Sequence, residues 1–146
     1  MQKGMIVSLA IGLTSGLLVG AIGTSCAGPK TNMVNTGGTV IMTPSGTLSN
    51  GVRVIQVRAK KYEFIPGEIV VHQGEKVRLD LSSDDVTHGI ELSEFKVDQR
   101  IEPGKPVSVE FIAAKAGTYT FHCSVFCGMG HMSMRGKLEV LPSATP

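Results

Sequence analysis

The chain has 146 residues, enough for one domain of ordinary size and a tail, and its formal net charge is only +2. Lys and Arg (14) nearly balance Asp and Glu (12), so the charge gives no case for a nucleic-acid partner. With 18 Gly and only 5% aromatic residues, the composition suits a turn-rich β protein better than a helical bundle. Three Cys are too few for a disulfide framework.

The N-terminus carries an apolar run from Met5 to about Ile22, with Lys3 as the only charge before it. This pattern is typical of a secretory signal or a membrane anchor, and its length fits either. Cys26 follows small residues at the end of the run, which resembles a bacterial lipoprotein processing box. We therefore expect residues 1–27 to be a signal peptide, a membrane helix or a lipid-anchored segment. Each alternative places the rest of the chain on the outer, periplasmic side of the bacterial cytoplasmic membrane.

The remaining chain divides by composition into three parts. Residues 28–50 are rich in Thr, Asn, Gly, Ser and Pro with little periodicity, so they are predicted to be a flexible linker. The folded domain is expected to span residues 51–141. Residues 142–146 are left as a short tail.

Within the expected domain, short runs of alternating apolar and polar residues are separated by turn signals. The turn signals are Pro66-Gly67, Gln73-Gly74, Pro103-Gly104 and Ala116-Gly117. This spacing predicts an all-β sandwich, and no helix of useful length is evident. In the run from Val52 to Phe64, the apolar residues change from one face of the strand to the other between Val54 and Ile55. This change predicts a bulge or a bend there.

Because side chains alternate between the two faces of a strand, strand parity also indicates which candidate metal ligands point inward. In the run 117–123, Cys123 shares a face with Phe121, while His122 points to the opposite face. Cys123 is therefore expected to point inward, and His122 is not expected to be a ligand. In the run 86–92 the apolar residues share a face with His88, so an imidazole is delivered into apolar surroundings. Such a histidine is commonly a core residue, but the ligand-rich segment downstream favours a metal ligand.

That downstream segment, residues 123–134, contains two thiols, an imidazole and a thioether. The four side chains are Cys123, Cys127, His131 and Met134. Soft sulfur with imidazole is the donor set that copper prefers. On an ideal helix all four would share one face, but Gly128 and Gly130 and the strand pattern before them favour a folded loop.

Other interpretations of the same residues stay open. A disulfide between Cys123 and Cys127 is chemically allowed outside the cytoplasm, zinc accepts two Cys and two His, and Met134 could simply fill the core. Copper uses a thioether and zinc does not, so Met134 favours copper. A mononuclear blue copper site needs one Cys, whereas two thiolates in one loop can bridge two copper ions that share an unpaired electron.

His88, preceded by Asp85, and the motif C-S-x-x-C-G-x-x-H-x-x-M from Cys123 to Met134 resemble the CuA cupredoxin domain of cytochrome c oxidase subunit II. The short chain is most similar to the compact form found in ba3-type oxidases, and nitrous oxide reductase shares the pattern more loosely. The resemblance implies a cupredoxin-like Greek-key β-sandwich or barrel. It implies two copper ions bridged by Cys123 and Cys127, one completed by His88 and weakly by Met134, the other by His131 and the backbone carbonyl of Val125.

The function implied by this resemblance is one-electron transfer, as subunit II of a haem–copper terminal oxidase. The expected partners are cytochrome c or a small copper protein as donor, a haem-containing catalytic subunit as acceptor, and the membrane. No constellation for substrate chemistry is visible in the chain itself. Because the chain has no Trp, Phe126, Met129 and Met132 are candidates for an apolar rim that accepts electrons near His131. The alternatives are a freestanding membrane-tethered electron carrier and, from the two additional methionines, a copper-handling protein for delivery or sensing.

Overall fold

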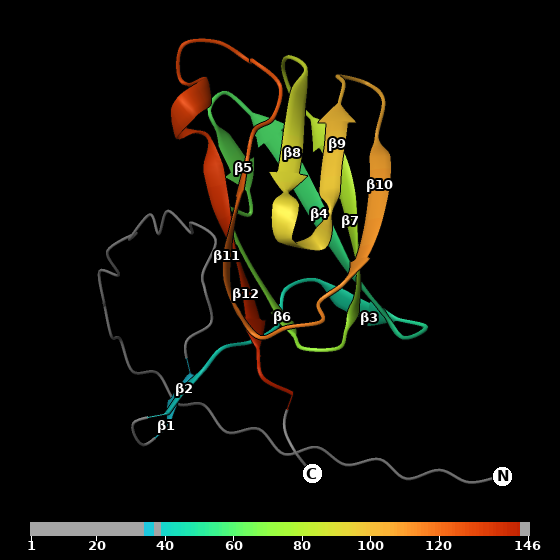
Figure 1. Cartoon of the computed structure of the whole chain (residues 1–146), viewed down its shortest axis with the longest axis vertical. Coiled ribbons are helices and arrows are strands. Elements are labelled where there is room, and N and C mark those ends of the chain that lie inside the picture. Colours follow the sequence, from blue (N-terminus) through green and yellow to red (C-terminus); the bar gives the residue numbers. More distant parts are fainter. Residues whose placement is uncertain (1–33, 37–38, 144–146) are drawn as a thin grey trace, which may run out of the picture. The chain divides into compact units, whose positions relative to one another are not determined.

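The computed structural model describes residues 34–36 and 39–143, which fold almost entirely as strands (Figure 1). The strands are β1 (Val34–Thr36), β2 (Thr39–Ile41), β3 (Thr47–Ser49), β4 (Val52–Lys60), β5 (Glu63–Ile65), β6 (Glu68–His72), β7 (Lys76–Ser83), β8 (His88–Leu92), β9 (Val97–Ile101), β10 (Val107–Ile112), β11 (Gly117–His122) and β12 (Arg135–Leu141). The helices in this described part are two short 3-10 turns, η1 (Ser93–Phe95) and η2 (His131–Ser133).

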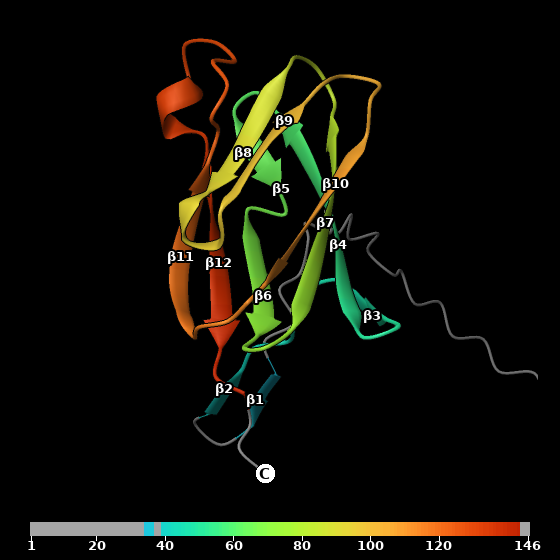
Figure 2. The ribbon, with the colours of Figure 1, turned by 45° about the vertical axis from the view of Figure 1, so that its right-hand side comes forward.

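Apart from the β1–β2 hairpin, the strands form two five-stranded sheets that face each other (Figure 2). One sheet has the order β10-β7-β4-β3, with β5 also paired to β4, and the other has the order β6-β12-β11-β8-β9. The pairs β4–β7 and β6–β12 are parallel. The all-β sandwich predicted from the sequence is confirmed, and each of the four predicted turn signals lies between two strands or at the start of one.

The core lies between the sheets and follows the alternation of the strands. In β4, Ile55, Val57 and Ala59 are buried while the residues between them face solvent. Of the bulge or bend predicted between Val54 and Ile55, the bulge is wrong, because β4 pairs with β7 in one continuous register. The parity shift has a different cause: the first three residues of β4 are only partly buried at the end of the core, so their side chains are not sorted by burial.

The sandwich begins before the predicted domain boundary at residue 51. β3 lies within the stretch 28–50 and pairs with β4. Ser45 also joins the fold, because its amide donates to the carbonyl of Val70 (2.7 Å) and its hydroxyl accepts from the Val70 amide (2.9 Å). These contacts attach residues from Ser45 onward to the sheets. The predicted signal or anchor at residues 1–27 lies outside the described residues.

No helix within residues 34–36 and 39–143 combines the length and the apolar character needed to cross a lipid bilayer.

Three neighbouring strands of the second sheet converge on one end of the sandwich. β8 begins with His88, β11 ends at His122 directly before Cys123, and β12 begins directly after Met134. The amide of Cys123 donates to the carbonyl of Met134 (3.0 Å), which closes the loop between β11 and β12 at its base. The loop crosses the top of the sandwich in Figure 1, so residues far apart in the sequence meet there.

Candidate metal centre

The structure brings together the donor atoms of all five side chains predicted as ligands. The two thiols face each other, with 3.8 Å between Cys123 Sγ and Cys127 Sγ. Cys123 Sγ lies 3.9 Å from Nδ1 of His88, and Cys127 Sγ lies 3.8 Å from Nδ1 of His131. Met134 Sδ lies 3.8 Å from Cys127 Sγ. Each thiol therefore has an imidazole of its own, and the two imidazoles come from different segments.

This donor cluster is shielded from solvent. The exposed fraction ranges from 0% for His88 to 6% for Cys127, and only His131 is partly exposed. The ligating atoms of His88, Cys123 and Cys127 all lie within 4.8 Å of one another. The sixth predicted ligand, the carbonyl oxygen of Val125, lies 3.1 Å from Cys123 Sγ. A metal held here would be surrounded mostly by protein, with contact to solvent on the side of His131.

The distance between the two sulfurs tests the remaining alternatives. A disulfide bond would bring them to about 2.0 Å, so the thiols at 3.8 Å are free. Two sulfurs bound to one tetrahedral metal at about 2.3 Å each would be separated by about 3.8 Å. The spacing therefore fits thiolates that share a metal, and the adjacent thioether of Met134 adds a donor that suits copper better than zinc.

Burial also affects the protonation of one metal-free thiol, that of Cys127. It raises the pKa of Cys127 to about 11, with a further contribution from the neighbouring Cys123. At neutral pH the metal-free Cys127 is thus a thiol. Because the thiolate is the form that binds metal, a metal must displace this proton when it binds.

His88 is oriented by the carboxylate of Asp85, whose Oδ1 lies 2.8 Å from Nε2 of the ring. Burial by itself would raise the pKa of Asp85, but hydrogen bonds from His88 and from the amides of Lys61 and Val86 outweigh it and lower the pKa to about 2. The ionised carboxylate can only accept a hydrogen bond, so Nε2 of neutral His88 carries the hydrogen. The lone pair of Nδ1 is then free and faces Cys123.

Asp85→Asn is expected to weaken copper binding about 10-fold to 100-fold, because the amide neither carries the charge nor fixes the tautomer of His88. Competition with a copper chelator measures this affinity. Asp84→Asn is the matched control, since Asp84 is the neighbouring carboxylate and pairs instead with the exposed Arg58 (2.8 Å). An equal loss of affinity in both variants would show that general surface charge, and not the orientation of His88, is responsible.

The loop from Cys123 to Met134 is built from successive turns and not from an α-helix. The amides of His131, Ser133 and Met134 each donate to the carbonyl three residues earlier, at 3.0 to 3.1 Å. Tyr62, from the turn between β4 and β5, packs against Gly128 and Gly130, where a Cβ at Gly130 would lie only 2.4 Å from its ring. Sequence reasoning missed Tyr62 as a support of this loop, because nothing in the local pattern around it indicates a contact with a distant glycine.

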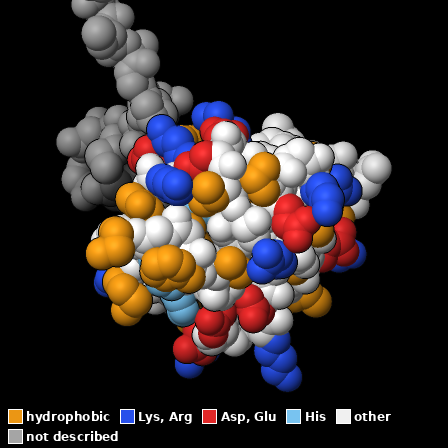
Figure 3. All heavy atoms as spheres, turned by 90° about the horizontal axis from the view of Figure 1, so that it is seen from above, with side chains coloured by type: hydrophobic (Ala, Val, Ile, Leu, Met, Phe, Trp, Pro, Cys, Tyr) orange, Lys and Arg blue, Asp and Glu red, His pale blue; other side chains and the backbone are white. Residues whose placement is uncertain are grey.

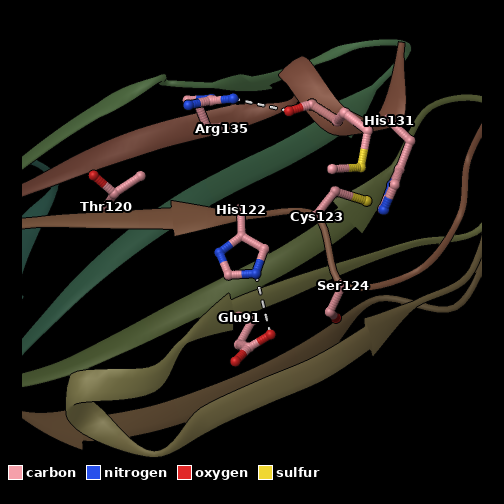
Figure 4. Close-up of a pocket in the computed structure, with 8 residues that line it drawn as sticks. Glu91, Thr120, His122, Cys123, Ser124, His131 and Arg135 are labelled. Atoms are coloured by element: carbon pink, nitrogen blue, oxygen red, sulfur yellow. Dashed lines mark hydrogen bonds and ion pairs between the residues drawn. The ribbon is translucent and has the colours of Figure 1, made fainter. Parts of the chain in front are cut away.

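His122 lies outside the donor cluster, in agreement with strand parity. Its side chain is 51% exposed, and its Nε2 is 3.2 Å from Oε2 of Glu91 on β8. Figure 4 shows its ring directed toward Glu91, whereas the side chains of Cys123 and His131 point toward one another on the other side of a pocket.

Hydrophobic side chains gather beside a histidine on the end of the sandwich that holds the loop (Figure 3). Three of the exposed large hydrophobic residues belong to the loop itself: Phe126, Met129 and Met132. The ring of Phe126 lies 5.7 Å from that of His131, measured between centroids. The loop therefore presents an apolar surface around the one partly exposed side chain of the donor cluster.

Comparison with known proteins supports the same interpretation of the fold. The sequence model of the cupredoxin-like domain family matches residues 34–140. Over 86 residues the chain is 29% identical to cytochrome c oxidase subunit 2 of Thermus thermophilus, covering 59% of this chain and 64% of the relative. Over 120 residues it is 28% identical to nitrous-oxide reductase of Stutzerimonas stutzeri, covering 79% of this chain and 19% of that protein. The chain thus spans less than two thirds of the length of these relatives.

Solved structures of other proteins share the fold. A chain of a heme-copper terminal oxidase dimer is similar with a TM-score of 0.59 and 26% identity, covering 67% of this chain and 71% of the other. The periplasmic domain of subunit II of cytochrome oxidase (CoxB) of Bradyrhizobium japonicum shares the fold with a TM-score of 0.58 and 23% identity, covering 70% of this chain and 89% of the other.

Proposed function

Because this chain belongs to the cupredoxin-like domain family, we propose that its buried donor cluster is a binuclear CuA-type copper centre that transfers single electrons. The observation that carries the proposal is the pair of free thiols 3.8 Å apart, each with its own imidazole. A single blue copper ion needs only one thiolate. A second buried thiol, with a second histidine beside it, supports a site for two ions.

The ligand roles implied by the sequence resemblance are compatible with these positions. Cys123 and Cys127 would be shared by both ions. His88 and Met134 would complete one ion, and His131 with the carbonyl of Val125 would complete the other. Bound copper would supply reversible one-electron oxidation and reduction.

The chain's own contribution is to hold the donors still and to limit their contact with water. The donors are attached to three hydrogen-bonded strands, β8, β11 and β12, and Asp85 fixes the ring of His88. A rigid, apolar site changes little in geometry when its charge changes, which favours fast electron transfer.

We propose further that the chain is the electron-accepting subunit II of a haem–copper terminal oxidase, on the periplasmic side of the membrane. Its relatives named cytochrome c oxidase subunit 2 and its likeness to a chain of a heme-copper terminal oxidase support this role. Cytochrome c or a small copper protein would dock on the apolar loop surface, bringing its cofactor near His131. Electrons would then pass to haem in the catalytic subunit.

Copper content and electron paramagnetic resonance of the copper-loaded chain test the proposal. Two coppers per chain, with hyperfine structure from both nuclei, are expected. One copper with single-nucleus hyperfine structure would contradict the binuclear centre. Co-purification with a haem-containing subunit would support the oxidase role, and recovery of the copper-loaded chain without one from native membranes would favour a freestanding carrier.

A further inference from the structure

The buried donors pose a question of access. Cys123 and Cys127 are almost fully buried, yet a hydrated copper ion must reach them from solvent. An open pocket of about 440 Å³ adjoins the cluster, and its lining includes both Cys123 and His131 (Figure 4). Of the predicted ligand side chains, these two alone line the pocket. The pocket therefore offers a path from solvent to both halves of the donor cluster.

The outer part of this pocket carries donors that the buried centre does not use. His122 and Glu91 lie side by side through the pairing of β11 with β8, with 3.2 Å between Nε2 and Oε2. Met132, on η2, also lines the pocket and is 82% exposed, so its thioether is not needed to fill the core. Imidazole and thioether are donors for cuprous ion. The lining also holds one carboxylate, of Glu91, and one guanidinium, of Arg135, so the soft donors and not the net charge make the pocket suitable for copper.

The placement of Met132 is held by Arg135, the first residue of β12. Its guanidinium donates to the carbonyl oxygen of Met132 at 2.9 Å. Arg135 itself is opposite His122 in the pairing of β11 with β12. The imidazole and the thioether are thus presented to one pocket by adjacent, hydrogen-bonded strands and the turn that joins the loop to them.

We propose that this pocket is the uptake site for cuprous ion, where His122 and Met132 bind the metal transiently before it passes to Cys123 and His131. The proposal rests on the copper centre proposed above. The transfer is an exchange of ligands without a change in oxidation state. The bonds from copper to His122 and Met132 break as a bond to Sγ of Cys123 forms, and the thiol proton of Cys123 leaves to water in the open pocket.

The test measures how fast the metal-free full chain takes up cuprous ion, kept in solution by acetonitrile without oxygen, by stopped-flow absorbance. His122→Ala combined with Met132→Leu is expected to slow uptake about tenfold while the final copper content stays unchanged. Leucine keeps the size and apolar character of Met132 and removes only the sulfur donor. The endpoint reports on the proposed centre, and the rate reports on the uptake site.

The chain supplies matched controls for both substitutions. His72 is a partly exposed histidine that is also paired with a glutamate, Glu75 at 3.8 Å. Met129 is another exposed methionine of the same loop, and it does not line the pocket. His72→Ala combined with Met129→Leu is expected to leave the rate unchanged. Each of three results would overturn the proposal. The His122/Met132 variant could take up copper as fast as wild type, both double variants could be slowed equally, or the His122/Met132 variant alone could lose copper at the endpoint. A wild-type endpoint without copper would instead reject the centre itself.

Discussion

Cys123→Ser and Cys127→Ser are each expected to abolish the two-copper centre, whereas Met134→Leu is expected to leave it formed with a shifted reduction potential. Each thiol faces the other sulfur and one imidazole, so its loss removes a ligand that both ions would share. The thioether of Met134 is a weak donor in an apolar setting, which tunes a copper site more than it holds one. Copper content, paramagnetic resonance and voltammetry of the three variants measure these effects.

A buried serine could also disturb folding, so the free energy of unfolding of the metal-free variants serves as the control. Both cysteines belong to the buried core, and the hydroxyl is smaller and more polar than the thiol, so a loss of stability is expected that this control measures separately from copper loss. The division of roles would be wrong if Met134→Leu lost as much copper as the cysteine variants. It would also be wrong if either serine variant kept two coppers.

Gly89→Ala is expected to destabilise the metal-free protein by about 1–3 kcal/mol and to reduce copper binding. Gly89 follows His88 in β8, and a Cβ there would lie 2.3 Å from Oγ of Ser124 and 3.1 Å from the amide nitrogen of Val125. Rotation of Ser124 can relieve the first overlap, but the second involves backbone between the two cysteines. The added methyl group must therefore displace the loop that carries the donors.

Denaturant unfolding of the metal-free protein and copper titration measure these two effects. Gly67→Ala is the matched control, because a Cβ there would meet only the carbonyl oxygen of Phe64 at 3.4 Å, an ordinary contact. A Gly89→Ala variant as stable as the Gly67→Ala variant, with full copper content, would show that the loop does not depend on this close approach.

Much of the strand pattern could be predicted from the sequence because burial between two sheets imposes a period of two on each strand. Val77, Leu79 and Leu81 alternate with polar residues and are all buried in β7. The same rule placed Cys123 inside and His122 outside. It failed where burial is incomplete, at the start of β4, where a bulge or a bend was predicted and a continuous register without a bulge was found.

The donor residues themselves were identifiable because their chemistry lies in a short motif. Cys123, Cys127, His131 and Met134 are close in the chain, so any compact loop brings them near one another. His88 is 35 residues from Cys123, and only the pairing of β8 with β11 places its Nδ1 at 3.9 Å from the thiol. The sequence indicated which side of its strand this histidine occupies, and the sheet order decided what it meets.

The supports of the site came from the tertiary structure alone. The contact of Tyr62 with Gly130, the close approach of Gly89 to Val125 and the pocket shared by Glu91 and His122 each join segments that are distant in the chain. By itself, the sequence determined the strand periodicity and the chemical nature of the donors, because both are local properties. The tertiary structure decided how those donors are oriented, supported and reached by solvent, because these depend on the packing of strands whose neighbours are not set by local sequence.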